Sequence, residues 1–156
     1  MTGWTLEQLS DHRDIEDVLV RYAMSLDARD WATLETVFLP GAAATLGHRE
    51  CANRDEIIAT CRAALSGLTH SQHIVTNFTI NVDGDTATSR CYLHAQHNYL
   101  EATGDPNFVV AGTYEDELVR TEAGWRIAHR RLKVAWVEGN AGLMDQAEGA
   151  YTKSQA

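Results

Sequence analysis

The segment THSQHIVTNFTINVDGDTATSRCYLHAQHNYL, residues 69–100, carries the clearest secondary-structure pattern in the chain. Apolar and polar side chains alternate through much of residues 69–82 and again through residues 86–100, as they do in strands with one buried face. The Asp-Gly-Asp sequence at 83–85 lies between them, and Asp-Gly in this setting is a strong hairpin signal. The segment therefore predicts two long antiparallel strands joined by a tight turn.

Two more strands are predicted after this hairpin. A loop at residues 103–107 leads to a strand over 108–120, and a turn at 122–124 leads to a strand over 125–137. The chain before residue 69 has the spacing of helices instead. Helices first and antiparallel strands afterwards predict an α+β fold, with a curved sheet packed on N-terminal helices.

The first part of the chain predicts three helices and a short strand. Apolar residues recur at steps of three and four over residues 15–26, after a cap at residue 10 or 11. A short second helix is predicted over residues 30–38 and a strand over 42–46. A sequence that resembles a capping box begins the third helix at residues 53–56.

Composition and charge limit the classes of protein that fit. The 156 residues predict one domain over 1–137, and the Gly-, Ala- and polar-rich residues 138–156 predict a flexible tail or a flap over a pocket. The net charge of −9, without a run of Lys or Arg, argues against nucleic-acid and membrane partners. Three cysteines without a CxxC pair, and a start unlike a signal peptide, favour a cytoplasmic location.

No motif for a nucleotide cofactor or a metal occurs in the sequence. GxGxxG, GxxxxGK(S/T) and the GxSxG elbow are missing, and so are HExxH, HxH and any short Cys/His cluster. We therefore expect a protein that works without a cofactor and without a metal.

Asp27 is the first candidate for chemistry. It follows Ile15 by twelve residues and Leu19 by eight, so a helix that extends this far places its carboxylate on the buried stripe. Burying a carboxylate away from water costs free energy unless a partner group pairs with it. Two interpretations follow: a solvated cap beyond the helix end, or a buried base held by a partner.

The seven histidines include candidate partners for this carboxylate. Strict alternation places one set of side chains on a common face of the strand over 69–82: His73, Val75, Asn77 and Thr79. It places a polar set on a common face of the next strand: Tyr92, His94, Gln96 and Asn98. This polar face indicates either the lining of a pocket or a surface in contact with solvent.

These residues stand in motifs by which the chain resembles the SnoaL-like branch of the nuclear-transport-factor-2-like superfamily. It shares most with scytalone dehydratase, hexachlorocyclohexane dehydrochlorinase and bile-acid 7α-dehydratase, over about residues 10–137. The motifs are YAMSLDARDW at 22–31, SQHIVTN at 71–77, YLH at 92–94 and GWRI at 124–127. The resemblance implies a cone-shaped α+β barrel with a curved mixed or antiparallel sheet, no cofactor, and a homotrimer or a dimer.

The resemblance also implies roles for single side chains. Asp27 and His73 match the family's catalytic Asp and His. Tyr22 matches a functional Tyr of the bile-acid enzyme, and His94 a second pocket His of scytalone dehydratase. Arg130 matches a pocket Arg of the dehydrochlorinase.

Further positions are expected to line the substrate pocket: Asn77, Tyr114 and Leu46. Leu26 and Leu46 stand where scytalone dehydratase holds its substrate with tyrosines, which argues against scytalone as the substrate. The dehydrochlorinase has Lys in place of Tyr22, which argues against halide elimination.

The predicted function is a dehydratase-type lyase acting on a small hydrophobic substrate with a ring. Asp27 would fix the tautomer of His73, whose free ring nitrogen would remove a proton beside an activating group. His94 or Tyr22 would protonate the departing hydroxyl, although Tyr22 also fits a core position and His94 a plain wall of the pocket. Two alternatives stay open: an isomerase or cyclase on a polyketide or steroid-like substrate, and a binding protein without turnover.

Overall fold

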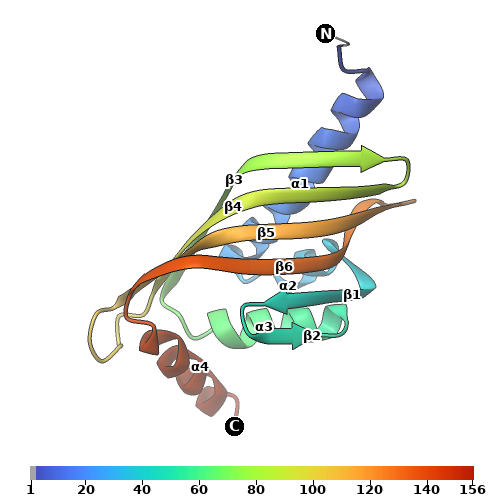
Figure 1. The fold of residues 1–156 in the computed structure, drawn as a ribbon. Coiled ribbons are helices and arrows are strands. Elements are labelled where there is room, and N and C mark those ends of the chain that lie inside the picture. The colour runs from blue at the N-terminus through green and yellow to red at the C-terminus, as the bar shows by residue number, and fades with distance from the viewer. Residues whose placement is uncertain (1–2) are drawn as a thin grey trace.

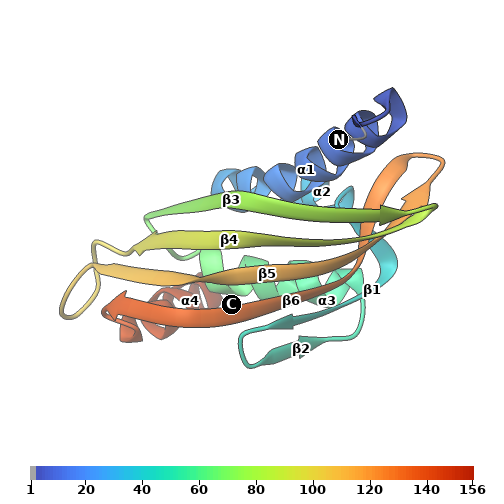
Figure 2. The ribbon, with the colours of Figure 1, turned by 45° about the horizontal axis from the view of Figure 1, so that its top comes forward.

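The computed structural model describes residues 3–156, which form a six-stranded sheet with helices packed on one of its faces (Figure 1). The helices are α1 (Leu6–Ala28), α2 (Trp31–Glu35), α3 (Arg54–Leu65) and α4 (Gly142–Ser154). The strands are β1 (Phe38–Leu46), β2 (Arg49–Cys51), β3 (His70–Asp83), β4 (Thr86–Asn98), β5 (Asn107–Thr121) and β6 (Gly124–Gly139). The hydrophobic core fills the space between the helices and the inner face of the sheet, while Figure 2 looks onto the opposite face, which no helix covers.

The sheet is mixed and open, with strand order β2-β1-β6-β5-β4-β3. Strands β3 to β6 pair antiparallel in chain order, and β6 then pairs with β1 in parallel. The predicted α+β class is therefore confirmed. The predicted barrel is not closed, because β2 and β3 remain as edges.

Helix α1 begins earlier than the sequence predicted. Thr5 and Gln8 form a capping box, in which each side chain accepts a hydrogen bond from the other residue's backbone N–H. The first turns carry exposed apolar side chains, Leu6 and Leu9, so the stripe from residue 15 onward does not show where the helix starts. At its other end α1 extends past Asp27 to Ala28.

Strand β3 contains a bulge that strict alternation did not predict. Asn77 has a φ of 58°, and the register of pairing with β4 shifts between Thr76 and Thr79. Before the bulge, His73 and its odd-numbered neighbours face the interior. After it the inward set becomes even-numbered: Phe78, Ile80 and Val82. Asn77 is exposed and does not share the inward face with His73, so its predicted place in the pocket is wrong.

On β4 the polar set faces away from the core. Tyr92 and His94 are exposed on the outer face of the sheet, and the ring of His94 packs 5.8 Å from that of Trp136. The inward set is Cys91, Leu93, Ala95 and His97, all buried. The solvent interpretation of this face was therefore correct, and the expectation of a pocket lined by His94 was wrong.

The sequence predicted a flexible tail or a flap over a pocket for the last nineteen residues, and the structure forms a helix there. These residues complete β6 and form α4, whose Leu143 and Ala147 are fully buried. Helix α4 packs closely on the chain just after α3, where a Cβ on Gly67 would collide with the carbonyl of Ala147. The short strand β2 was also not predicted. None of the helices within residues 3–156 has both the length and the apolar character that crossing a membrane requires.

Candidate functional site

The end of α1 and the start of β3 bring Asp27 and His73 together. Asp27 Oδ1 lies 2.7 Å from His73 Nδ1, and Asp27 Oδ2 accepts the backbone N–H of His73 at 2.8 Å. The His73 side chain is 6% exposed and that of Asp27 is 21% exposed. Both carboxylate oxygens are thus tied to one residue, which fixes the ring relative to the helix.

Two neighbouring side chains extend this contact. The Ser71 hydroxyl donates to Asp27 Oδ1 at 3.1 Å. Arg29 Nη1 in turn donates to Ser71 Oγ at 2.7 Å and to the carbonyl of Leu26 at 2.7 Å. The structure therefore joins Arg29, Ser71, Asp27 and His73 in one chain of hydrogen bonds.

The surroundings of Asp27 favour its charged form. Burial acts to raise the pKa of its carboxyl group, but hydrogen bonds from the side chain and backbone of His73 and from Ser71 outweigh it, so the pKa lies below the ordinary value. Because a carboxylate only accepts, His73 Nδ1 carries the proton of their shared hydrogen bond. In the neutral ring Nε2 then has the lone pair, and no group within residues 3–156 hydrogen-bonds it.

His97 lies beside His73 and was not among the predicted site residues. The two ring centroids are 5.6 Å apart, and His97 Nδ1 donates to the carbonyl of Phe108 at 3.2 Å. Burial, with a contribution from neighbouring His73, lowers the pKa of His97 to about 4, so the ring is neutral at neutral pH. The sequence did contain a signal, since His97 stands in register with the apolar Leu93 and Ala95.

Arg130 belongs to a second polar cluster deeper in the core. Its Nε and Nη2 donate to Asp116 at 2.7 and 2.8 Å, and its guanidinium lies 4.0 Å from the ring centre of Tyr22 and 4.2 Å from that of Tyr114. Burial acts against this charge, but the Asp116 carboxylate outweighs it and raises the pKa of Arg130. Arg130 Nη1 is buried and has no hydrogen-bond partner among the described residues.

Among residues 3–156, no hydrogen bond joins Tyr22 or Leu46 to the Asp27–His73 pair. The Tyr22 hydroxyl lies 3.9 Å from Cys61 Sγ, and burial raises its pKa well above the ordinary value. Tyr22 therefore corresponds to its alternative interpretation as a core residue. Leu46 is half-buried at the end of β1, where it pairs with Leu132 of β6.

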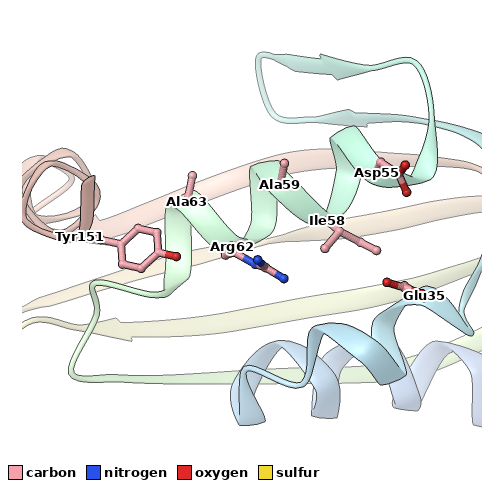
Figure 3. Close-up of a pocket in the computed structure, with 7 residues that line it drawn as sticks. All are labelled: Glu35, Asp55, Ile58, Ala59, Arg62, Ala63 and Tyr151. Carbon is pink, nitrogen blue, oxygen red and sulfur yellow. The ribbon is translucent and has the colours of Figure 1, made fainter. Parts of the chain in front are cut away.

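A surface groove of about 290 Å³ lies between α2, α3 and α4 (Figure 3). Its floor is Ile58 with two alanines of α3, and its charged groups are Glu35, Asp55 and Arg62. None of the residues of the Asp27–His73 pair lines it. We therefore place the candidate chemistry at the pair, where a base is already oriented, and not at this groove.

The described residues, 3–156, contain no group of three or more His, Cys, Asp or Glu side chains placed to hold a metal ion.

Comparison with known proteins supports the resemblance noted in the motifs. The family model described as the SnoaL-like domain matches residues 7–131. An uncharacterized protein of Mycobacterium tuberculosis is 33% identical over 134 residues, which cover 81% of this chain and 86% of the relative.

Two solved structures are similar in fold. A proposed scytalone dehydratase of Novosphingobium aromaticivorans has a TM-score of 0.77 at 22% identity, with 85% of this chain and 89% of the other covered. A hexachlorocyclohexane dehydrochlorinase of Novosphingobium barchaimii has a TM-score of 0.76 at 17% identity, with 88% and 94% covered. At these identities the likeness concerns the fold alone.

Proposed function

Because the chain belongs to the SnoaL-like domain family, we propose that it is a cofactor-independent carbon–oxygen lyase that uses the Asp27–His73 pair as its acid/base group. The observation that carries the proposal is the 2.7 Å contact of Asp27 Oδ1 with His73 Nδ1, which leaves Nε2 free to act as a base. The names of the two proteins of similar fold, a dehydratase and a dehydrochlorinase, both denote eliminations and support this reaction type.

The first step of the proposed reaction is removal of a proton from carbon. His73 Nε2 takes the proton from a carbon beside a carbonyl or another activating group. The ionised Asp27 stabilises the imidazolium that forms, because its carboxylate already accepts the Nδ1 proton. The electron pair of the broken C–H bond then forms the C=C bond as the C–O bond breaks.

The departing hydroxyl needs a proton, and the groups assigned to it from the sequence are badly placed. His94 lies on the outer face of the sheet, and Tyr22 is buried in the Arg130 cluster. His97 is neutral, with its Nδ1 proton engaged by Phe108. We therefore assign the donation to the His73 imidazolium, which returns the proton to the leaving oxygen, releases water and regenerates the neutral base.

One further group is proposed to bind the substrate. The second ring nitrogen of His97 can accept a hydrogen bond from a substrate hydroxyl, because the first one donates to Phe108. Arg130 is not assigned a substrate contact, because its guanidinium is enclosed in the core by Asp116, Tyr22 and Tyr114.

An isomerase or cyclase is the second candidate. The observation that favours it is the single free base: one imidazole that takes a proton and holds it can deliver the proton to another carbon as readily as to oxygen. The mass of the product distinguishes the two reactions.

The test is a mass-spectrometric screen with hydroxylated aromatic, polyketide and steroid ketones. We expect a product lighter by one water molecule with the wild type, and no such product with His73→Ala or Asp27→Asn. Products of unchanged mass would replace the lyase with an isomerase or cyclase, and tight binding without turnover would indicate a binding protein.

His94→Ala tests the assignment of the proton donor in the same screen. We expect it to retain full activity, as should a matched exposed histidine variant on β3, His70→Ala. A general acid contributes about 10²- to 10⁴-fold, so a loss of that size in His94→Ala would restore His94 as the donor.

A further inference from the structure

The residue that ends α1 has a backbone conformation that its side chain does not favour. Arg29 has φ 57° and ψ 28°, in the left-handed region that commonly follows a helix and is usually occupied by glycine. Residues with a Cβ adopt it at a cost. Such a conformation persists where the surrounding structure fixes it, as the backbone N–H groups of Arg29 and Asp30 do here by donating to the carbonyls of Leu26 and Ser25, and it often marks a functional site.

The side chain of Arg29 reaches the Asp27–His73 pair through Ser71. Its guanidinium has donors only, so Ser71 Oγ must accept the 2.7 Å hydrogen bond from Nη1. The Ser71 proton is then directed at Asp27 Oδ1, 3.1 Å away. Oδ1 is the same oxygen that receives the Nδ1 proton of His73.

The charge of Arg29 also acts at this site. Its guanidinium is half-buried, and Asp27 is the acidic group that favours its protonated form. The same positive charge contributes to the low pKa of His97, after burial and neighbouring His73. Arg29 therefore affects His97 although it contacts that ring through no hydrogen bond among the described residues.

We propose that Arg29 is a positioning residue of the Asp27–His73 pair and that it acts through the hydroxyl of Ser71. With Arg29 present, Ser71 has one available acceptor, and the Asp27 carboxylate keeps a fixed donor beside His73. Without Arg29, the Ser71 hydroxyl can rotate away and the carboxylate loses both that donor and the nearby cation. The link to catalysis rests on the proposed function, whereas the hydrogen-bond chain itself does not.

Arg29→Gly removes the side chain and retains the left-handed backbone conformation, so the two effects can be tested apart. Glycine adopts the left-handed conformation without strain, so this variant should fold with a melting temperature equal to or above that of the wild type. Ser71→Ala removes the middle of the chain of hydrogen bonds. Arg29→Lys keeps a cation with donors and serves as the conservative variant.

The readout is nuclear magnetic resonance of the site in the absence of substrate. Loss of a donor and of a cation disfavours the carboxylate, so the ¹³C titration of Asp27 should show its pKa raised in Arg29→Gly and Ser71→Ala. The ¹⁵N signals of the His73 ring should show a smaller fraction protonated at Nδ1. Arg29→Lys should bring both signals back toward those of the wild type.

The proposal is overturned if Arg29→Gly leaves the Asp27 and His73 signals at their wild-type values, because Arg29 would then serve only to end the helix. Turnover found in the substrate screen adds a second readout, and kcat of Arg29→Gly should fall about 10²-fold, with KM changed much less. Altered signals without turnover on any substrate would keep the positioning role and reject the lyase. Turnover that depends on His73, together with unaltered Asp27 and His73 signals in Arg29→Gly, would support the lyase and reject the positioning role of Arg29.

Discussion

His94 and His97 lie three residues apart on β4 and face opposite sides of the sheet. A strand turns successive side chains to opposite faces, so the two histidines have opposite surroundings. His94 meets solvent beside Trp136, and His97 is 5% exposed beside His73. The choice of His94 depended on matching positions along a strand. If such a match is displaced by an odd number of residues, it assigns every side chain to the wrong face of the sheet.

The burial of His97 makes the stability of the protein depend on pH. Its pKa is about 4 in the folded state, against 6.5 in the unfolded chain. Between these values the unfolded chain binds a proton that the folded one does not, so acid favours unfolding. Above pH 6.5 His97 is neutral in both states and does not reduce the free energy of unfolding. As the pH falls from 6.5 to about 4, the free energy of unfolding decreases by about 3 kcal/mol because the unfolded chain alone binds the proton.

Urea unfolding of the wild type and of His97→Phe at several pH values measures this contribution. The free energy of unfolding should fall less steeply with acid in the variant. The pKa of Asp27 is lowered in the folded state, so its protonation also destabilises both proteins as the pH falls. This effect is the same in the two proteins and cancels in the comparison. Equal slopes for the two proteins would show that His97 titrates normally.

The helices and strands were predicted well where a periodic pattern covers a long segment. The antiparallel strands from β3 to β6 and the helices α1 and α3 fall close to their predicted ranges because apolar periodicity reflects burial on one face. The bulge at Asn77 broke this relation, since a positive φ at one residue shifts all later side chains to the other face. Asn tolerates that conformation better than most residues, but nothing in the alternation itself shows where it occurs.

Helix α4 could not be predicted because its stability comes from distant contacts. Its sequence is rich in Gly, Ala and polar residues, which is typical of flexible segments. Two side chains one helical turn apart, Leu143 and Ala147, provide the buried stripe. They pack near Gly67, a position that sequence spacing does not connect with them.

Gly67→Ala tests the docking of α4. The new Cβ would collide with the carbonyl of Ala147, so we expect a loss of about 1–3 kcal/mol in the free energy of unfolding. Gly149→Ala is the matched control in α4 itself, where a Cβ meets nothing. It should stabilise the protein by about 0.5–1 kcal/mol, because glycine is unfavourable inside a helix. Similar effects of both substitutions on chemical unfolding would contradict the close packing of α4.

The uncovered face of the sheet gives the whole molecule a candidate surface for self-association. Three large apolar side chains are 49–52% exposed on three of its strands: Ile74, Tyr92 and Trp136. Exposed apolar groups gathered on one face are typical of contacts between proteins. We propose that copies of this chain associate through this face, as a trimer or a dimer.

Light scattering at micromolar concentration tests this association. The wild type should have a mass that is a multiple of 17.3 kDa, and Trp136→Glu should reduce it toward 17.3 kDa. Met24→Glu changes an equally apolar, 64% exposed side chain on α1 and should leave the mass unaltered. A wild-type mass of 17.3 kDa would reject the proposed oligomer.

The position of β6 has a consequence for how the chain is made. Strand β6 follows the other five strands along the chain but lies inside the sheet, between β1 and β5. The hairpins from β3 to β5 can form while synthesis continues, but β1 and β2 must wait for residues 124–139 before they join them. During that interval β1 has one of its edges unpaired. The nascent protein is therefore most exposed to aggregation in the interval before residues 124–139 are available.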